Sequence, residues 1–203
     1  MSERWIPLDA KDCDPSPFVQ FHAWFHDASE VMRDREAIAL VTASSDAKPS
    51  ARMVLLRHVD ASSFGWYSNY ESRKGVELDQ NPYAALLWYC EGLGRQIRIE
   101  GSVEHMSAEE SDEYFSARPR GHQLGAHASH QSAFLESRQY LETAMHDEEL
   151  RYEGRDVPRP PYWGGFLLKP NFFEVWQHRE DRLHDRVFYR LVGSTWVRER
   201  HAP

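Results

Sequence analysis

The spacing of hydrophobic residues is irregular at the start of the chain and then becomes helical. Residues 1–14 are polar and aperiodic, and we expect them to form a flexible N-terminal segment. Phe18, Phe21 and Phe25 then recur at helical spacing, which predicts an amphipathic helix that ends near Arg33. From there the pattern of the chain becomes strand-like.

Short apolar and β-branched runs, separated by turn residues, make up most of the remaining chain and predict strands. They cover residues 38–42, 51–59, 64–68, 83–90, 95–104, 163–168, 172–177 and 187–197, the last folded at Gly193-Ser194. Six or more short strands joined mainly by hairpins favour an antiparallel closed sheet over a doubly wound one. We therefore expect an α+β, mostly antiparallel fold, a β-barrel with flanking helices, as a single domain over residues 1–203.

Three further helices are predicted between these strands. Ser72 precedes a short helix that Asn81-Pro82 stops, and Ser107 with Glu110 matches a capping box. The apolar positions between 132 and 152 predict a longer helix over that range.

The amino-acid composition indicates which binding partners and which cellular compartment to expect. The 203 residues carry 24 Lys and Arg against 32 Asp and Glu, a formal charge of -8, so general attraction to nucleic acid or an anionic membrane is not expected. Cys13 and Cys90 form neither a C-x-x-C pair nor a disulfide framework. No leader is evident, and no run approaches the roughly 20 apolar residues of a membrane span. We expect a soluble, cytoplasmic protein that holds anions at local basic sites.

Two basic segments are candidates for such sites. Arg52 and Arg57 lie at the ends of an apolar strand, where alternation aims them at opposite faces unless a bulge or bend intervenes. Arg73 and Lys74 stand at a predicted helix N-terminus, where free N–H groups and the helix dipole favour a phosphate. Solvated strand ends and a solvated basic turn are the competing interpretations of each segment alone.

A third candidate lies near the end of the predicted helix after Ser107. Tyr114, Arg118 and Arg120 offer a phenol and two guanidinium groups, which suit a phosphate ester, although arginines there can also simply complement the helix dipole. His127 and His130 lack a nearby carboxylate or cysteine in a recognised spacing, so we predict no metal site.

The C-terminal run from residue 182 to 186 is dense in polar groups. Strand alternation would place Arg182, His184 and Arg186 on one face, where they need an anionic or electron-rich ligand or must point to water. Trp163 and Trp176 precede this run, and tryptophans are more often core residues than cofactor contacts.

Taken together and in order, these segments resemble the pyridoxamine 5'-phosphate (pyridoxine 5'-phosphate) oxidase family. The matching segments are Arg52-Met53-Val54-Leu55-Leu56, Asn69-Tyr70-Glu71-Ser72-Arg73-Lys74, Arg95-Gln96, Tyr114-Phe115-Ser116-Ala117-Arg118-Pro119, Gln131-Ser132, Trp163-Gly164-Gly165-Phe166 and Glu174-Val175-Trp176-Gln177 through Arg186. The resemblance runs from about Pro17 to Pro203. It implies a split β-barrel that binds flavin mononucleotide (FMN) and works as a homodimer, with the flavins at the subunit interface and residues 163–203 as a dimerisation and active-site region.

The resemblance also implies which residues contact the ligands. FMN contacts would be Arg52, Met53, Val54, Leu55, Leu56, Arg57, Tyr67, Ser68, Arg73, Lys74, Gln96, Gln131, Ser132, Trp176 and Arg186, some of them from the partner subunit. Substrate contacts would be Arg57, Tyr114, Arg118 and His122 around a phosphate, with Arg182 and His184 as catalytic residues over a pyridine ring. The implied reaction oxidises pyridoxamine or pyridoxine 5'-phosphate to pyridoxal 5'-phosphate by hydride transfer to the flavin, which O2 reoxidises with release of hydrogen peroxide.

The chain departs from the family pattern at three places. Arg57 replaces the common lysine, His122 replaces a small hydroxyl residue, and Arg4 and Trp5 do not match the arginine-containing N-terminal segment that can fold over the substrate. Three alternatives therefore stay open. They are a flavin oxidase of the phenazine-biosynthesis type, disfavoured by Tyr114 and Arg118; a deazaflavin-dependent reductase, disfavoured by the complete C-terminal motif; and a flavin- or pyridoxal-phosphate-binding protein without turnover.

Overall fold

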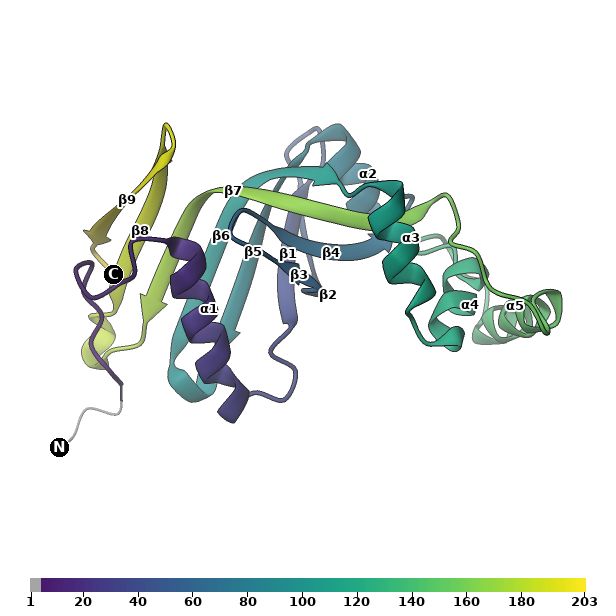
Figure 1. Ribbon diagram of the computed structural model, residues 1–203, viewed down its shortest axis with the longest axis horizontal. Coiled ribbons are helices and arrows are strands. Elements are labelled where there is room, and N and C mark those ends of the chain that lie inside the picture. Colours follow the sequence, from purple (N-terminus) through teal and green to yellow (C-terminus); the bar gives the residue numbers. More distant parts are fainter. Residues whose placement is uncertain (1–4) are drawn as a thin grey trace.

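A computed structural model describes residues 5–203, and within that range the strands form one nine-stranded antiparallel sheet (Figure 1). The strands are β1 (Ala37–Ala43), β2 (Pro49–Leu55), β3 (His58–Val59), β4 (Phe64–Asn69), β5 (Tyr83–Cys90), β6 (Arg95–His105), β7 (Trp163–Gln177), β8 (Asp185–Val192) and β9 (Thr195–His201). The helices are α1 (Pro17–Asp27), α2 (Arg73–Gln80), α3 (Ala108–Ser116), α4 (Arg120–Ala128) and α5 (Arg138–Arg151). Short 3₁₀ turns cover Ala28–Glu30, Glu91–Leu93 and Glu180–Arg182. The predicted α+β, mostly antiparallel class is confirmed.

The sheet divides at β7, its longest strand. One edge of β7 pairs with β6, while the other pairs with β4 over its first six residues and with β8 over its last six. The two strands predicted at 163–168 and 172–177 are therefore one strand of 15 residues. A bulge opposite Gly101 accommodates Pro170, and a Cβ on Gly101 would lie 2.1 Å from the Lys169 carbonyl oxygen. The branching sends β4 toward one end of the molecule and β8 and β9 toward the other (Figure 1).

Aromatic side chains of α1 fill the concave side of the sheet. The ring of Phe18 stacks on Phe64 at 5.7 Å and meets Phe173 edge-on at 5.3 Å. Phe21, fully buried, packs edge-on against Phe64 at 4.9 Å and faces Trp88. Burial of these rings supplies much of the hydrophobic stabilisation of the barrel and fixes α1 across it.

The prediction of one continuous strand over 51–59 is wrong, because β2 and β3 are separate strands. The chain pairs with β1 up to Leu55 and with β4 from His58 onward, because it changes neighbours between the two. At the change, Leu56 N–H donates to the Glu36 carbonyl at 2.8 Å and Arg57 N–H donates to that of Gly65 at 2.9 Å. This bend breaks the strand alternation between Arg52 and Arg57.

The region between β6 and β7 is also corrected. The helix predicted over 132–152 begins only at Arg138, where the Ser137 side chain caps it, and α4 is a helix that the sequence pattern did not predict. Only Gln123, Leu124 and Ala128 of α4 are buried, so its sequence carries little periodic signal. The capping box at Ser107, by contrast, is present as predicted.

The described part of the N-terminal segment packs on β8 and β9. Leu8 N–H donates to the Asp185 carboxylate at 3.0 Å, Arg200 donates to the Leu8 carbonyl at 3.1 Å, and the Tyr189 hydroxyl donates to the Asp14 carbonyl at 2.8 Å. Residues 8–14 are thus attached to the sheet, unlike the flexible segment expected over 1–14. Arg4 and the residues before it lie outside the described range. No helix within residues 5–203 is long and apolar enough to cross a membrane.

Candidate functional site

One cavity collects residues from distant parts of the sequence. The main cavity, of about 500 Å³, is lined by Met53, Val54, Leu55, Arg57, Tyr67, Ser68, Lys74, Tyr114, Ala117, Arg118, Pro119, His122, Gln131 and Trp163. All except Ala117, Pro119 and Trp163 are residues that the sequence predicts as FMN or substrate contacts. The bend after β2 is what lets Arg57 join this cavity together with residues of β4 and α3.

A buried lysine stands at the α2 edge of the main cavity. The Nζ of Lys74 donates to Ser68 Oγ and Ser72 Oγ, both at 2.9 Å, and to Gln131 Oε1 at 3.0 Å. Its side chain is only 7% exposed, and this burial, with a smaller contribution from Arg52, lowers the pKa of Lys74 to about 8. Ser72 also caps α2 by accepting from the Gly75 N–H. Lys74 has no ionic partner among residues 5–203, and such a cation at a helix N-terminus is well suited to bind an anion.

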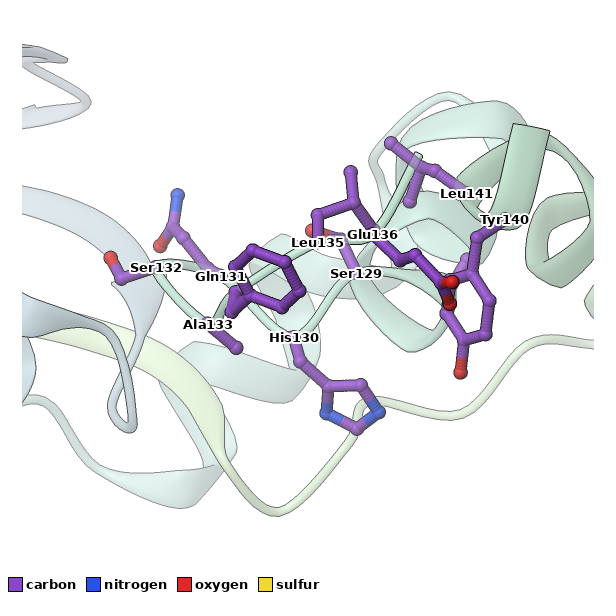
Figure 2. A pocket seen from close by; sticks show the side chains of 11 residues that line it. Ser129, His130, Gln131, Ser132, Ala133, Leu135, Glu136, Tyr140 and Leu141 are labelled. Atoms are coloured by element: carbon purple, nitrogen blue, oxygen red, sulfur yellow. The ribbon is translucent and has the colours of Figure 1, made fainter. Parts of the chain in front are cut away.

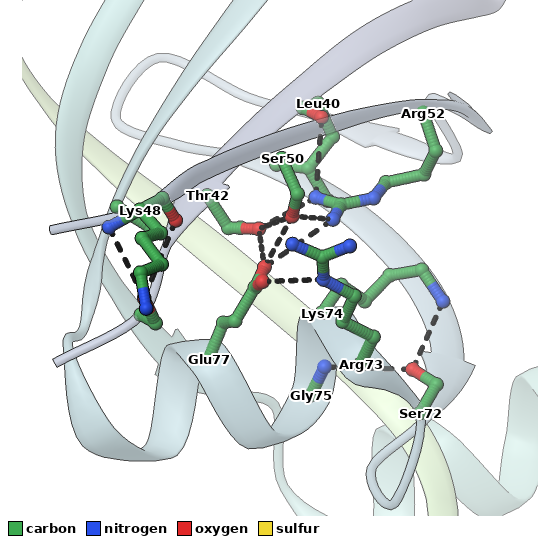
Figure 3. Close-up of polar contacts among 12 residues, drawn as sticks. Leu40, Thr42, Lys48, Ser50, Arg52, Ser72, Arg73, Lys74, Gly75 and Glu77 are labelled. Carbon is green, nitrogen blue, oxygen red and sulfur yellow. Dashed lines mark hydrogen bonds and ion pairs between the residues drawn. The ribbon is translucent and has the colours of Figure 1, made fainter. Parts of the chain in front are cut away.

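Arg52 and Arg73 lie beside the main cavity rather than on its wall. Both guanidinium groups reach the carboxylate of Glu77, which the sequence analysis did not single out (Figure 3). The only sequence signal for this contact is the spacing of Arg73 and Glu77, four residues apart on a predicted helix. Leu56, another predicted FMN contact, does not line the main cavity, because its side chain is buried in the core.

Stacked aromatic rings form the opposite wall. Tyr67 and Tyr114 lie parallel with ring centroids 3.7 Å apart, and Trp163 continues the stack at 5.6 Å from Tyr67. The guanidinium carbon of Arg118 lies 4.5 Å from the Trp163 ring centroid. Burial lowers the pKa of Arg118, and its buried Nη1 has no hydrogen-bond partner within residues 5–203. This donor is available to a ligand in the main cavity. Arg120, in contrast, donates to backbone carbonyls at the end of α5 and does not take part.

The segment between α4 and α5 forms a second cavity of about 520 Å³ (Figure 2). It is lined by residues 128–136 together with Tyr140 and Leu141. Ser132 lies here and in a neighbouring cavity beside Arg73 and Glu77, rather than in the main cavity. Gln131 borders all three cavities, so only the first residue of the predicted pair Gln131-Ser132 reaches the main cavity.

The remaining predicted residues lie on the far arm of the sheet, the part in which the end of β7 pairs with the start of β6 and with β8, and β8 pairs with β9. Gln96, Trp176 and Arg186 are direct neighbours across β6, β7 and β8. Arg186 Nε donates to the buried Glu174 carboxylate at 2.6 Å, which fixes the guanidinium. The Trp176 ring lies 4.6 Å from that of His184.

The prediction that Arg182, His184 and Arg186 share one strand face is wrong. β8 begins only at Asp185, and Asp181 and Arg182 have φ of 53° and 61°, in the left-handed region, so strand alternation does not reach them. His184 is placed instead by its ring contacts and by its Nδ1, which accepts the Arg179 N–H at 3.1 Å. Burial first, and then the neighbouring His178 and Arg182, lower the pKa of His184. The neutral imidazole therefore carries its hydrogen on Nε2.

These two sets of residues occupy opposite ends of the molecule. Figure 1 shows α3 and α4 at one end of β7, and β8 and β9 at the other. No hydrogen bond, ion pair or ring contact joins the main cavity to Trp176, His184 or Arg186 within the described part of the chain. One chain thus presents two separate half-sites.

Comparison with protein families gives two matches that together span most of the chain. The model described as "Pyridoxamine 5'-phosphate oxidase" matches residues 26–152. The model described as "Pyridoxine 5'-phosphate oxidase C-terminal dimerisation region" matches residues 163–203.

Similar curated proteins and solved structures extend over nearly the full length. A pyridoxine/pyridoxamine 5'-phosphate oxidase of Cyanothece sp. is 48% identical, covering 98% of this chain and 94% of the relative. A pyridoxine/pyridoxamine 5'-phosphate oxidase of Rubrobacter xylanophilus is 49% identical, covering 94% of this chain and 88% of the relative. The crystal structure of PhzG from Burkholderia lata, in complex with tetrahydrophenazine-1-carboxylic acid, has a TM-score of 0.92 at 29% identity and covers 100% of both chains. A pyridoxamine 5'-phosphate oxidase-related, FMN-binding protein of Nostoc punctiforme shares the fold, with a TM-score of 0.72 at 17% identity, covering 95% of this chain and 99% of that one.

Proposed function

Because the chain belongs to the pyridoxamine 5'-phosphate oxidase family, we propose that it oxidises pyridoxamine 5'-phosphate, pyridoxine 5'-phosphate or both to pyridoxal 5'-phosphate. The cofactor is FMN. When bound, FMN would supply the redox chemistry, as the acceptor of a hydride from the C4' carbon of the substrate that O2 then reoxidises with release of hydrogen peroxide. Pyridoxine 5'-phosphate would give the aldehyde directly, whereas pyridoxamine 5'-phosphate would give an imine that water hydrolyses to the aldehyde and ammonia. The residues of the chain hold and orient the two phosphorylated molecules.

The observation that carries this proposal is the pair of cationic groups around the main cavity. At the α2 edge, Lys74 and the adjacent Arg52 and Arg73 fit the phosphate monoester of FMN, with the helix N-terminus behind them. At the α3 edge, Arg118 has a buried donor without a partner among residues 5–203 and lines the main cavity together with Tyr114 and Arg57. Two separate cationic groups match one phosphorylated cofactor and one phosphorylated substrate.

The far arm supplies the groups for the ring of the substrate. His184, neutral and with its hydrogen on Nε2, can donate a hydrogen bond to a substrate oxygen or nitrogen. Arg182 is exposed and brings a positive charge that stabilises electron density on a pyridine ring. Trp176 and Arg186 lie beside them and would contact the flavin.

A homodimer joins the two half-sites. Arg182 and His184 follow the C-terminal end of β7, whereas Trp163 at the other end of this 15-residue strand lines the main cavity, so the two residues lie away from the main cavity of their own chain. A second copy, related by a two-fold axis and associated through the C-terminal dimerisation region, would place its far arm over this cavity. We therefore assign Gln96, Trp176, Arg182, His184 and Arg186 of each active site to the partner chain.

A second candidate function follows from the similarity to PhzG. That relative was solved with tetrahydrophenazine-1-carboxylic acid, and the similarity to it covers the whole chain. The curated relatives at 48% and 49% identity are instead named for vitamin B6 phosphates. Tyr114 and Arg118, which suit a phosphate, favour the first function.

The test is reconstitution of the purified protein with FMN and assay under air with pyridoxamine 5'-phosphate, pyridoxine 5'-phosphate, unphosphorylated pyridoxamine and a reduced phenazine carboxylic acid. We expect a yellow protein that forms pyridoxal 5'-phosphate and peroxide in equal amounts from the phosphorylated substrates. Turnover of the phenazine alone would favour the second function, and colour without any turnover would favour a binding protein. No flavin retention would refute both oxidase assignments.

A further inference from the structure

We propose that Glu77 is the positioning residue of the FMN phosphate site, where it holds the guanidinium groups of Arg52 and Arg73 in place for the phosphate. This inference rests on the proposed function, since it takes the cationic cluster at α2 as the place of the FMN phosphate. Nothing in the sequence motifs or in the family comparison assigns a role to this carboxylate.

The carboxylate of Glu77 is the centre of a closed hydrogen-bond network (Figure 3). Its Oε1 accepts from Arg73 Nε at 2.8 Å. Its Oε2 accepts from Ser50 Oγ at 2.6 Å, from Arg52 Nη2 at 3.3 Å and from the Thr42 hydroxyl. The residue is only 5% exposed. A buried carboxylate with this many donors has little freedom to move.

Arg52 is held from several sides by the same network. Its Nη1 donates to Thr42 Oγ1 at 2.6 Å and to the Leu40 carbonyl at 3.3 Å, and its Nη2 also donates to the Ser50 hydroxyl. Thr42 and Ser50 thus contact both the arginine and the carboxylate. Loss of Glu77 would leave the guanidinium of Arg52 with hydroxyl and carbonyl partners alone, none of them charged.

Arg73 is held by one atom only. Its Nε donates to Glu77, while its two terminal nitrogens make no hydrogen bond within residues 5–203. The side chain is 63% exposed, so solvent would allow many rotamers without this contact. Glu77 therefore restricts Arg73 and still leaves its terminal nitrogens for a phosphate oxygen.

Charge supports the same role. Lys74, Arg52 and Arg73 place three cationic groups at the start of α2, and Glu77 compensates one of them. Burial by itself raises the pKa of Glu77, but the hydrogen bonds from Ser50, Thr42 and Arg73 hold it at about 2, so the carboxylate is ionised throughout the neutral range. The two remaining positive charges match a phosphate that carries nearly two negative charges.

A purely structural role is the competing explanation, because Glu77 also ties α2 to β1 and β2 through Thr42 and Ser50. The two roles differ in what they do to flavins with and without a phosphate. A structural role acts on FMN and riboflavin alike. A positioning role acts on the phosphate alone, so riboflavin affinity stays the same.

The experiment compares wild type and Glu77→Gln by titration of the flavin-free protein with FMN and with riboflavin. We expect Glu77→Gln to weaken FMN binding about tenfold and to leave riboflavin binding within about twofold. Glu71→Gln is the matched control, because Glu71 is exposed at the same end of α2 and has no hydrogen bond or ion pair to either arginine among the described residues. This control should leave FMN affinity within about twofold of wild type.

Three results would overturn the inference: equal weakening of both flavins by Glu77→Gln, no change in either, or tighter FMN binding from the extra positive charge. Circular dichroism would check the fold of each variant. If Glu77→Gln is unfolded, Ser50→Ala decides instead, with a smaller loss for FMN alone expected and equal losses overturning the inference. Failure of the wild-type protein to bind either flavin would refute the proposed function itself. If the wild type binds FMN and Glu77→Gln binds it equally well, only the role of Glu77 is refuted.

Discussion

The two half-sites of the chain hold their polar groups in opposite ways. At the start of α2, Lys74 and Glu77 are buried and fully engaged with neighbours in the same chain. At the far arm, Arg182 is exposed on a left-handed backbone, and the ring of His184 is fixed by one backbone N–H and by other rings. The residues at the start of α2 are therefore suited to hold a ligand, whereas the residues of the far arm are suited to contact a substrate or a second chain. The comparison predicts that damage to α2 removes the cofactor, whereas damage to the far arm removes the reaction.

Lys74→Ala is expected to have the largest effect. It removes a buried cation with three hydrogen-bond partners at the proposed FMN phosphate site, and we expect FMN affinity to fall about 100-fold. Titration of the flavin-free variant measures this loss. Lys74→Arg is the control that keeps the charge, and FMN affinity unchanged in Lys74→Ala would contradict the assignment of this end.

Arg182→Ala tests the other half of the comparison. The side chain is exposed and does not line the main cavity of its own chain within residues 5–203, so FMN affinity should stay within about twofold of wild type while kcat/KM falls about 30-fold. Steady-state kinetics with FMN in excess separate the two effects. Equal loss of flavin in Arg182→Ala and Lys74→Ala would remove the distinction between the half-sites.

The pH dependence of FMN binding gives a smaller, graded test. Burial lowers the pKa of Lys74 to about 8, so the flavin-free protein loses this charge as the pH rises through that value. A phosphate favours the charged amine, and binding above pH 8 must therefore take up a proton. We expect FMN affinity to be constant between about pH 6.5 and 7.5, where its phosphate is mostly a dianion, and to fall up to about tenfold per unit above pH 8. Riboflavin, and the Lys74→Arg variant, should show no such slope in the same titration.

Arg57→Lys should have the smallest effect. Arg57 lines the main cavity, and the family pattern commonly has lysine in its place. The charge is kept and only the paired geometry of the guanidinium is lost, so KM should change by about threefold with kcat nearly constant. A larger loss of kcat would place Arg57 in the reaction rather than in phosphate binding.

Local signals in the sequence predict much of the fold. Ser72 and Ser107 cap helices as their spacing indicates, and the alternation of β1, β5 and β6 is clear along the chain. What failed depends on partners far away in sequence. The strand over 51–59 breaks because it changes neighbours, and β7 continues past Pro170 because a bulge at Asn171 of β7 accommodates the proline opposite Gly101.

The candidate site follows the same rule. Most residues of the main cavity come from motifs that the sequence displays, including Tyr114 and Arg118. Glu77 was missed because two of its donors, Thr42 and Ser50, come from strands 35 and 27 residues away. The prediction that Arg182 and His184 share a strand face was wrong because β8 begins only at Asp185 and the backbone at Asp181 and Arg182 is left-handed, which neither residue type predicts.

The central claim is that each active site combines the α2 end of one chain with the far arm of another. Mixing Lys74→Ala chains with Arg182→Ala chains, followed by denaturation and refolding together, tests it most directly. A dimer with one chain of each kind has one site with both substitutions and one site with neither. Random pairing should then restore about one quarter of wild-type turnover, although each variant alone is nearly inactive at limiting FMN. Activity no greater than the average of the two separate variants would show that both half-sites of an active site belong to the same chain, and would contradict this account.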